Sequence, residues 1–213
     1  MGETVLKDIK DALMKGDRAG VVAFTKCALE QGMAVKDILD KGLIAGMEII
    51  GNKFKCNEIF IPEVLISAKA MHAGMAILEP QFISCGIKPA GKVVIGTVKG
   101  DLHDIGKNIV SMMFKGACFE VADLGIDVPV EKFVDAAKKG GIDVIAMSSL
   151  LTTSMNSMKE TIKALERSGI RDKVKIMVGG APVTQDFANS IGADAYAKDA
   201  ATAVDKAKEM LKR

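Results

Sequence analysis

The sequence of 213 residues has no tryptophan, one tyrosine, five prolines and two histidines, and almost no excess charge. Its 29 basic and 27 acidic residues leave a formal net charge of +2, which gives no electrostatic reason to expect a nucleic-acid partner. There is no uninterrupted run of about 18 apolar residues, so no membrane span is expected. The opening segment, MGETVLKDIKDALMKG, also lacks the apolar stretch of a signal peptide.

The cysteines are few and widely spaced. Cys27, Cys56, Cys85 and Cys118 form no C-x-x-C pair. Such spacing favours free thiols in a reducing cytosol over a disulfide framework or a zinc site.

The first part of the chain has a helical pattern, because apolar residues recur at steps of three and four up to about Gly91. This periodicity predicts helices over residues 3–15, 17–31, 35–55 and 61–82, with Asp17 as an N-cap and Pro62 in a first turn. Four such helices can pack as a small bundle. The segment 84–91 is predicted to be a linker.

The second part alternates short β-rich runs with amphipathic helices. The runs cover residues 92–98, 119–125, 143–149, 174–180 and 195–198. Continuous apolar strands separated by helices predict a parallel sheet covered on both faces. We therefore expect an α/β protein with a helical domain over 1–88 and, over 89–213, a doubly wound, flavodoxin-like sheet of five strands in the order 2-1-3-4-5.

That strand order predicts where a ligand binds. The crevice of such a sheet forms at the carboxyl ends of strands 1 and 3, where the winding reverses. The loops there are GDLHDIG (100–106) and LLTTS (150–154), with GGAP (179–182) after the neighbouring strand. One pocket should therefore collect Asp101, His103, Ser154 and the pair Gly179-Gly180.

His103 is the candidate metal ligand of this pocket. One ring nitrogen can bind a metal while Asp101 holds the other N–H, and a hydroxyl such as that of Ser154 can extend the hydrogen-bonded chain toward solvent. One histidine is too few for a metal site made of protein alone, so a bound group must supply the other ligands. The alternative is that His103 is a loop or cap residue beside Asp104. The two glycines and the small polar run 148–154 favour a large planar ligand.

His72, the other histidine, lies between apolar residues of a predicted helix and is expected to pack there.

These residues form a recognisable fingerprint. The pattern D-x-H-x-x-G, then S-x-L, then G-G is matched by Asp101, His103, Gly106, Ser148, Leu150, Gly179 and Gly180. In this the sequence resembles the cobalamin-binding proteins that hold their cofactor in the base-off, His-on mode. The resemblance implies that His103 is the lower axial ligand of cobalt and that Asp101 and Ser154 form the relay behind it. It places Ser148, Thr152, Gly179 and Gly180 along the slot for the nucleotide tail.

The helical part shares the resemblance. The segment GNKFKCNEIFIPEVLISAKAM (51–71) is similar to the cap helices of methyl-carrying members, such as the cobalamin-binding module of methionine synthase and the corrinoid proteins of methanol, methylamine and betaine metabolism. The resemblance implies that Phe54 and Ile61 cover the upper face of the corrin. Because a covered methyl group cannot be attacked, we also expect the cap to move aside about the linker (83–91) when a methyltransferase docks. The alternative, that both side chains only pack against the other helices of the bundle, stays open.

The function implied by the resemblance is that of a cytoplasmic methyl carrier in one-carbon metabolism. Cob(I)alamin would accept a methyl group through a substrate-specific methyltransferase, and methyl-cob(III)alamin would donate it to a second methyltransferase that acts on tetrahydrofolate or a thiol coenzyme. A reductive activation protein is a further partner. The chain is thus expected to be a carrier subunit rather than a catalyst by itself, and the methyl donor stays open.

Other functions share parts of this pattern. A cobalamin-sensing regulator would normally add an output domain, and a mutase subunit shares the D-x-H-x-x-G loop, although the segment from Phe54 to Pro62 favours methyl transfer. A response-regulator receiver would need an aspartate after strand 3, where Ser148-Ser149 stands. A flavodoxin would need a hydroxyl-rich, phosphate-binding loop after strand 1, to which GDLHDIG is poorly suited.

Overall fold

The computed structural model describes residues 2–82, 85–86 and 88–212. It divides into two compact units: Met1–Pro89 with Lys115–Cys118, and Ala90–Phe114 with Phe119–Arg213. We call them the helical unit and the α/β unit. Part of the predicted linker, residues 84 and 87, lies outside the described residues.

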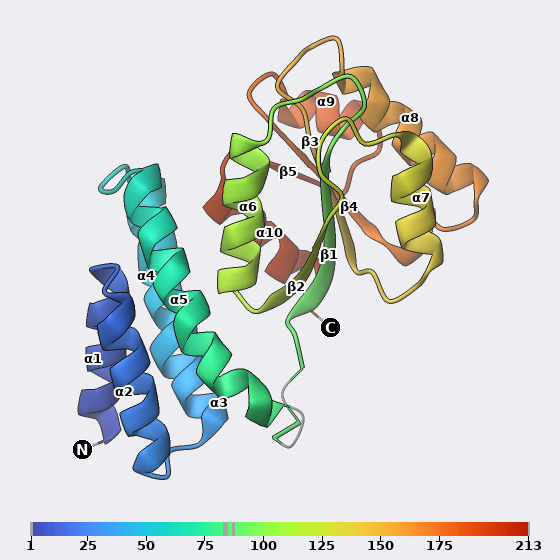
Figure 1. Cartoon of the computed structure of the whole chain (residues 1–213). Coiled ribbons are helices and arrows are strands. Elements are labelled where there is room, and N and C mark those ends of the chain that lie inside the picture. Colours follow the sequence, from blue (N-terminus) through green and yellow to red (C-terminus); the bar gives the residue numbers. More distant parts are fainter. Residues whose placement is uncertain (1, 83–84, 87, 213) are drawn as a thin grey trace. The chain divides into compact units, whose positions relative to one another are not determined.

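The helical unit contains the four predicted helical segments (Figure 1). They are α1 (Gly2–Met14), α2 (Arg18–Glu30), the segment formed by α3 (Val35–Asp37), a π-helix (Ile38–Ile44) and α4 (Ala45–Lys55), and α5 (Ile61–Phe82). Asp17 caps α2 as predicted, since its Oδ1 accepts a hydrogen bond of 2.9 Å from the Gly20 N–H. The helical bundle is confirmed.

The third segment differs from the regular helix predicted over 35–55. In the π-helix, which is wider than an α-helix, the Ala45 N–H donates to the Asp40 carbonyl, five residues earlier. This places the neighbours Ile38 and Leu39, and the neighbours Gly42 and Leu43, all in buried positions. Steps of three and four apolar residues occur in both helix types, so the sequence pattern does not distinguish them.

Helix α5 is long and apolar enough, by length and composition alone, to span a membrane. In the structure it packs against α2 and α4, and it buries Val64, Met71 and Leu78 in the bundle. It also carries Lys69 and His72 near its middle. These are the features of the core helix of a bundle.

The α/β unit is built on one sheet of five parallel strands. They are β1 (Gly91–Thr97), β2 (Phe119–Asp123), β3 (Val144–Ser148), β4 (Lys175–Gly179) and β5 (Ala195–Ala197). Their order is β2-β1-β3-β4-β5, which confirms the prediction. The winding reverses between β1 and β3.

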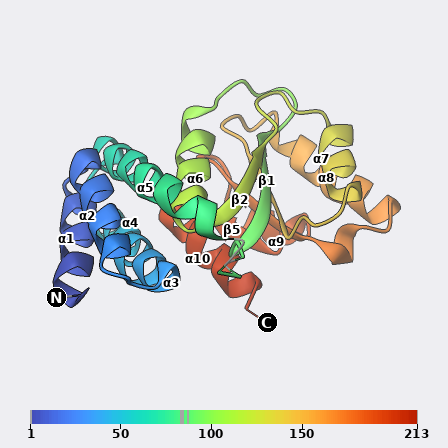
Figure 2. The same ribbon diagram turned by 60° about the horizontal axis from the view of Figure 1, so that its bottom comes forward.

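Helices cover both faces of the sheet. They are α6 (Ile105–Gly116), α7 (Val130–Lys138), α8 (Met155–Arg167), α9 (Gln185–Ser190) and α10 (Ala200–Met210), with a short 3₁₀ turn at Arg171–Lys173 before β4. Figures 1 and 2 show α6 and α10 on one face and α7 and α8 on the other.

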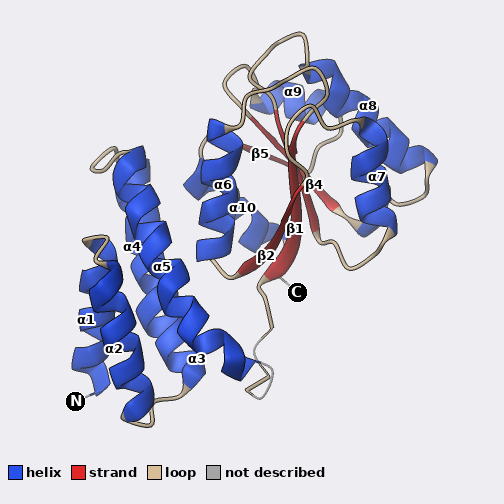
Figure 3. Cartoon of the chain, in the orientation of Figure 1, coloured by secondary structure: helices blue, strands red, loops and turns tan. Residues whose placement is uncertain are grey.

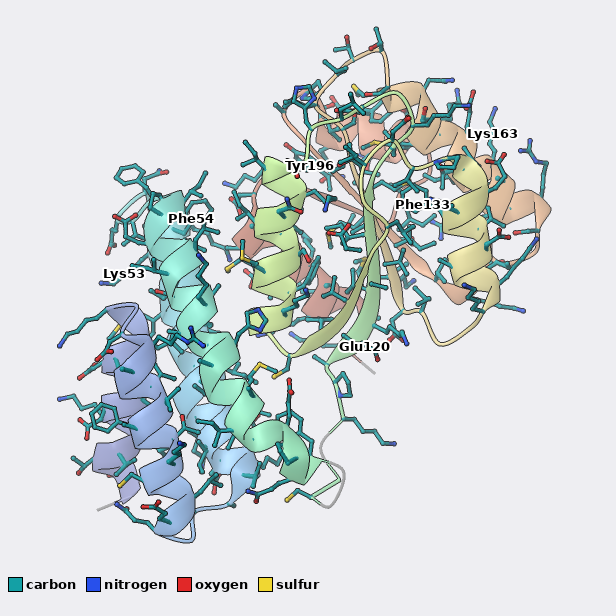
Figure 4. All side chains as sticks on the ribbon, viewed as in Figure 1. Lys53, Phe54, Glu120, Phe133, Lys163 and Tyr196 are labelled. Carbon is teal, nitrogen blue, oxygen red and sulfur yellow. The ribbon has the colours of Figure 1, made fainter. Side chains whose placement is uncertain are left out.

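The core on the α7 and α8 face joins Val94, Ile145 and Ile176 of the sheet with helical side chains such as Phe133 and Met158. Phe133 of α7, labelled in Figure 4, is fully buried in this core. Apolar positions on both sheet faces explain why these strands read as continuous apolar runs.

The carboxyl ends of the strands lie at one edge of the sheet, where the connecting loops gather (Figure 3). The loop after β3 contacts the end of β4, where the Ser149 N–H donates to the Gly179 carbonyl at 3.1 Å. Gly180 follows with a φ of +125°, and a Cβ there would lie 1.8 Å from the carbonyl oxygen of Ser149. Only glycine fits both the backbone conformation and this approach.

We predict that Gly180→Ala destabilises the protein by at least about 3 kcal/mol, because the added methyl group overlaps a neighbouring backbone. The matched control is Gly192→Ala, where φ is also positive (+77°) but no atom lies within 4 Å of the added Cβ. Backbone strain alone should cost about 1 kcal/mol there. Urea unfolding of the apoprotein measures both, and equal losses would contradict the steric explanation.

Candidate functional site

Asp101 is the centre of the candidate site. Its side chain lies just after β1 and is fully buried. The Oδ1 atom accepts two hydrogen bonds from His103, one from the backbone N–H at 3.0 Å and one from Nδ1 of the ring at 2.7 Å. A buried carboxylate therefore fixes both the backbone and the imidazole of His103.

The other carboxylate oxygen binds the loop after β3. Oδ2 accepts from the Leu150 N–H at 2.6 Å, the Leu151 N–H at 3.2 Å and the Ser154 Oγ at 3.2 Å. The Ser149 Oγ lies farther away, at 3.4 Å. Asp101 thus joins the loop after β1 to the loop after β3. The winding of the sheet reverses between these two strands.

These contacts decide the charge of Asp101. Burial by itself raises the pKa of a carboxyl group. Hydrogen bonds from the N–H groups of His103, Leu150 and Leu151 and from the His103 ring outweigh burial and hold the pKa of Asp101 well below its usual range. At neutral pH the side chain is an anion that only accepts hydrogen bonds, so the proton between it and Nδ1 belongs to His103.

His103 is held but accessible. Its backbone carbonyl accepts a hydrogen bond of 2.7 Å from the Thr97 Oγ1, yet 52% of its side chain is exposed. With the proton on Nδ1, the lone pair of the neutral ring is on Nε2, which is the nitrogen available to a metal. Among the described residues no group of three or more His, Cys, Asp or Glu side chains is placed to hold a metal ion. A metal bound by His103 must bring its other ligands.

Ser154 lies beside Asp101 as predicted, but it does not lead toward solvent. The residue is only 3% exposed, and its hydroxyl lies 2.7 Å from that of Ser149 and 3.0 Å from the Leu151 carbonyl. Ser149, which was not among the predicted site residues, is fully buried and completes this cluster. Its place inside the run 148–154, next to two fingerprint residues, was the available signal.

The glycines of the fingerprint play different structural parts. Gly179 pairs with Ser148 in the sheet, and Gly180 makes room for the backbone of Ser149. The space that the sequence analysis assigned to a planar ligand at Gly180 is therefore occupied by the chain itself. Gly106 is the opposite case, because no atom lies within 4 Å of a Cβ placed there. The packing of the chain gives no reason for glycine at this position.

Large apolar side chains are exposed around His103. Leu102 and Ile105, on either side of it in the sequence, are 68% and 74% exposed. The loops after β2 and β3 add Ile126, Leu150 and Leu151, and Thr152 is exposed beside them. Several exposed apolar side chains on neighbouring loops are typical of a binding surface for a ligand or a partner.

Phe54 and Ile61 belong to the helical unit. Phe54, labelled in Figure 4, is half-buried near the end of α4, and Ile61 is exposed at the start of α5. Their neighbour Phe60 was not among the predicted site residues. It is 65% exposed, and its N–H donates to Glu63 Oε2 at 3.1 Å. Its aromatic side chain next to Ile61 was the only signal.

Comparison with known proteins assigns the chain to a family. Two family models, each described as a B12 binding domain, match residues 5–79 and 91–205. The chain is 45% identical over 210 residues to the dimethylamine corrinoid protein 2 of Methanosarcina acetivorans, and the match covers 98% of this chain and 97% of that protein. The chain belongs to the corrinoid proteins.

Solved structures agree with this assignment. The crystal structure of a cobalamin-binding protein from Desulfitobacterium hafniense has a TM-score of 0.82 and 32% identity, covering 96% of this chain and 98% of that one. The methanol:cobalamin methyltransferase complex MtaBC of Methanosarcina barkeri contains a chain with a TM-score of 0.86 and 32% identity. That match covers 98% of this corrinoid protein and 80% of the other chain. The predicted combination of fold and family is confirmed.

The geometry fits a corrinoid. A corrinoid would bring the other ligands of its metal, so one protein nitrogen such as His103 Nε2 would be enough to hold it. The exposed apolar side chains of Leu102, Ile105 and Leu150 suit the hydrocarbon surface of a large ring. The open space at Gly106 lets a bulky group approach the first turn of α6.

We predict that Asp101→Asn destabilises the apoprotein by at least about 2 kcal/mol, because an amide nitrogen would face the donors that Oδ2 now accepts from. The matched control is Asp104→Asn, on the other side of His103. Asp104 is exposed, and its carboxylate accepts from the Asn108 side chain at 3.0 Å. A loss below about 0.5 kcal/mol is expected there. Similar urea-unfolding midpoints for the two variants would show that burial of Asp101 is not decisive.

Proposed function

We propose that this corrinoid protein binds its cofactor base-off and His-on, with His103 Nε2 as the lower axial ligand of cobalt, and carries a methyl group between partner proteins. The observation that supports this most directly is the 2.7 Å contact between His103 Nδ1 and the buried carboxylate of Asp101. It leaves Nε2 as the free nitrogen of a side chain that is half exposed. The bound corrinoid would supply a cobalt ion able to accept and release a methyl group.

The residues behind His103 fix its tautomer and its orientation. Asp101 fixes the Nδ1–H tautomer and increases the basicity of Nε2 toward a metal. Ser154 and the N–H groups of Leu150 and Leu151 hold Asp101 in its ionised form. These hydrogen bonds hold the imidazole in place whether or not a metal is bound.

The loops around His103 would contact the rest of the cofactor. Leu102, Ile105 and Leu150 would face the ring, and Gly106 would allow its close approach. We propose that Ser148, Thr152, Gly179 and Gly180 lie along the slot for the nucleotide tail, with Gly180 shaping that slot through its packing on Ser149. Phe54 and Ile61 would cover the upper face of the ring.

The partners we propose are two methyltransferases, one specific for the methyl donor and one that passes the group to tetrahydrofolate or a thiol coenzyme, in the cytoplasm. Support comes from the relatives: one is named for dimethylamine, and another is part of a methanol:cobalamin methyltransferase complex. A reductive activation protein would restore the reduced cobalt after accidental oxidation. The carrier itself would be common to such systems, while the partner selects the donor.

We predict that His103→Ala lowers the affinity of the apoprotein for cobalamin at least about tenfold and removes the absorption and EPR signatures of cobalt bound to a protein nitrogen. His72→Ala is the matched control, since His72 is half-buried on α5, where burial lowers its pKa. That variant should keep both signatures. An unchanged spectrum after loss of His103 would rule out the proposed ligand.

We also predict that Gly106→Ala separates cofactor binding from folding. The apoprotein should be as stable as the wild type or slightly more stable, because alanine favours a helix and meets no atom within 4 Å. Cobalamin affinity should fall about tenfold, since a methyl group would overlap the bound ring. Isothermal titration and urea unfolding measure the two effects, and unaltered affinity would show that the cofactor does not approach this turn.

A further inference from the structure

The loop that carries Asp101 and His103 begins with a tight turn over residues 98–101. The Asp101 N–H donates to the Val98 carbonyl at 3.2 Å, which closes the turn. Gly100 has a φ of +84°, whereas Lys99 is not among the residues with positive φ. This is the pattern of a type II turn, which differs from type I by a flip of its central peptide group. Here the central peptide consists of the Lys99 carbonyl and the Gly100 N–H.

Both polar groups of this peptide are held by side chains from neighbouring loops. The Gly100 N–H donates to Asp127 Oδ1 at 2.7 Å, and the Ser157 Oγ donates to the Lys99 carbonyl at 3.1 Å. Asp127 lies in the loop after β2, and Ser157 lies in the first turn of α8, after β3. Because β1 is between β2 and β3, the turn after β1 is held from both sides.

Asp127 makes a second contact with the same turn. Its own N–H donates to the Asp101 carbonyl at 3.0 Å. Its φ of +48° is in the left-handed region, which aspartate and asparagine tolerate better than most residues. This conformation lets one residue present both its N–H and its carboxylate to the turn.

We propose that Asp127 and Ser157 are positioning residues that hold the Lys99–Gly100 peptide in one orientation and so fix Asp101 and, through it, the imidazole of His103. A flipped peptide would point the Gly100 N–H away from Asp127 and the Lys99 carbonyl away from Ser157. The flip would therefore break both hydrogen bonds. The last step, from His103 to cobalt, rests on the proposed function. The positioning of the loop does not.

The position of these residues makes the inference testable. Asp127 is exposed and Ser157 is half-buried, and neither belongs to the apolar core of the sheet. Substitutions there remove contacts with the turn without opening a cavity.

The first experiment compares Asp127→Gly with Asp127→Asn in the apoprotein. Both suit a positive φ, but only asparagine keeps an oxygen that can accept from the Gly100 N–H. Amide hydrogen exchange of the His103 N–H, which is bonded to Asp101, reports how firmly the loop is held. We expect exchange about tenfold faster in Asp127→Gly, the factor that one ordinary hydrogen bond supplies, and within about twofold of wild type in Asp127→Asn.

A rate in Asp127→Gly that matches wild type would overturn the inference, and so would an equal acceleration in both variants. Urea unfolding of each variant separates a local effect from a global loss of stability. A purely structural role of Asp127 would change the unfolding midpoint without this difference between glycine and asparagine.

The second experiment tests the other contact and does not depend on the folding of Asp127→Gly. Ser157→Ala should also speed exchange of the His103 N–H, by about threefold to tenfold. The matched control is Ser168→Ala, which removes a similar hydroxyl donor, bonded to the Leu165 carbonyl at 2.9 Å, far along the chain from the turn. Equal rates in Ser157→Ala and Ser168→Ala would overturn the part assigned to Ser157.

The third experiment uses protein reconstituted with cobalamin. The fraction of Co(II) that carries a protein nitrogen, read from its EPR spectrum, should fall in Asp127→Gly and recover in Asp127→Asn. An equal fraction in wild type and Asp127→Gly would overturn the link from the turn to the metal. If the wild type itself shows no protein nitrogen on cobalt, the proposed function fails, and the exchange rates of the apoprotein still decide whether Asp127 holds the loop.

Discussion

The structure of the site depends on one buried anion. The carboxylate of Asp101 has no access to water, so every hydrogen bond it needs must come from the chain. It finds them in two loops that are far apart in the sequence: His103 on one side, and Leu150, Leu151 and Ser154 on the other. The contacts that stabilise the buried charge also orient the imidazole of His103. The stability of the loops and the geometry of the site therefore have one physical cause.

Around this anion the loops are held against one another by close backbone packing and by hydrogen bonds between side chains and backbone. Gly180 accepts the close approach of Ser149, and Thr97 holds the carbonyl of His103. Asp127 and Ser157 hold the peptide just before Asp101. Rigid support beneath an exposed apolar surface is what a large planar cofactor requires, because a preorganised site loses little entropy on binding. Leu102 and Ile105, both exposed, flank His103 in the segment that is held in this way.

Most of the fold could be predicted, because both units have strong and different periodicities. The five apolar strands, their order and the four helical segments follow from local patterns and from the rules of doubly wound sheets. The π-helix at Ile38–Ile44 could not be predicted, since its apolar spacing also suits an α-helix. Ser149 and Asp127 were missed for another reason: serine and aspartate in loops have no distinctive pattern, and their importance lies in which backbone groups they reach.

The sequence by itself determined the residue types of the site and the family to which the chain belongs, because D-x-H-x-x-G, S-x-L and G-G are short local patterns that lie at the carboxyl ends of three predicted strands, in order. Only the tertiary structure decided how these residues are used. It buried Ser154 instead of opening it to solvent, gave the space at Gly180 to a neighbouring backbone, and left Gly106 open. The physical reason is that hydrogen bonding and steric contact between loops depend on distances of a few tenths of an ångström, which are set by the packing of strands and helices far apart in the sequence.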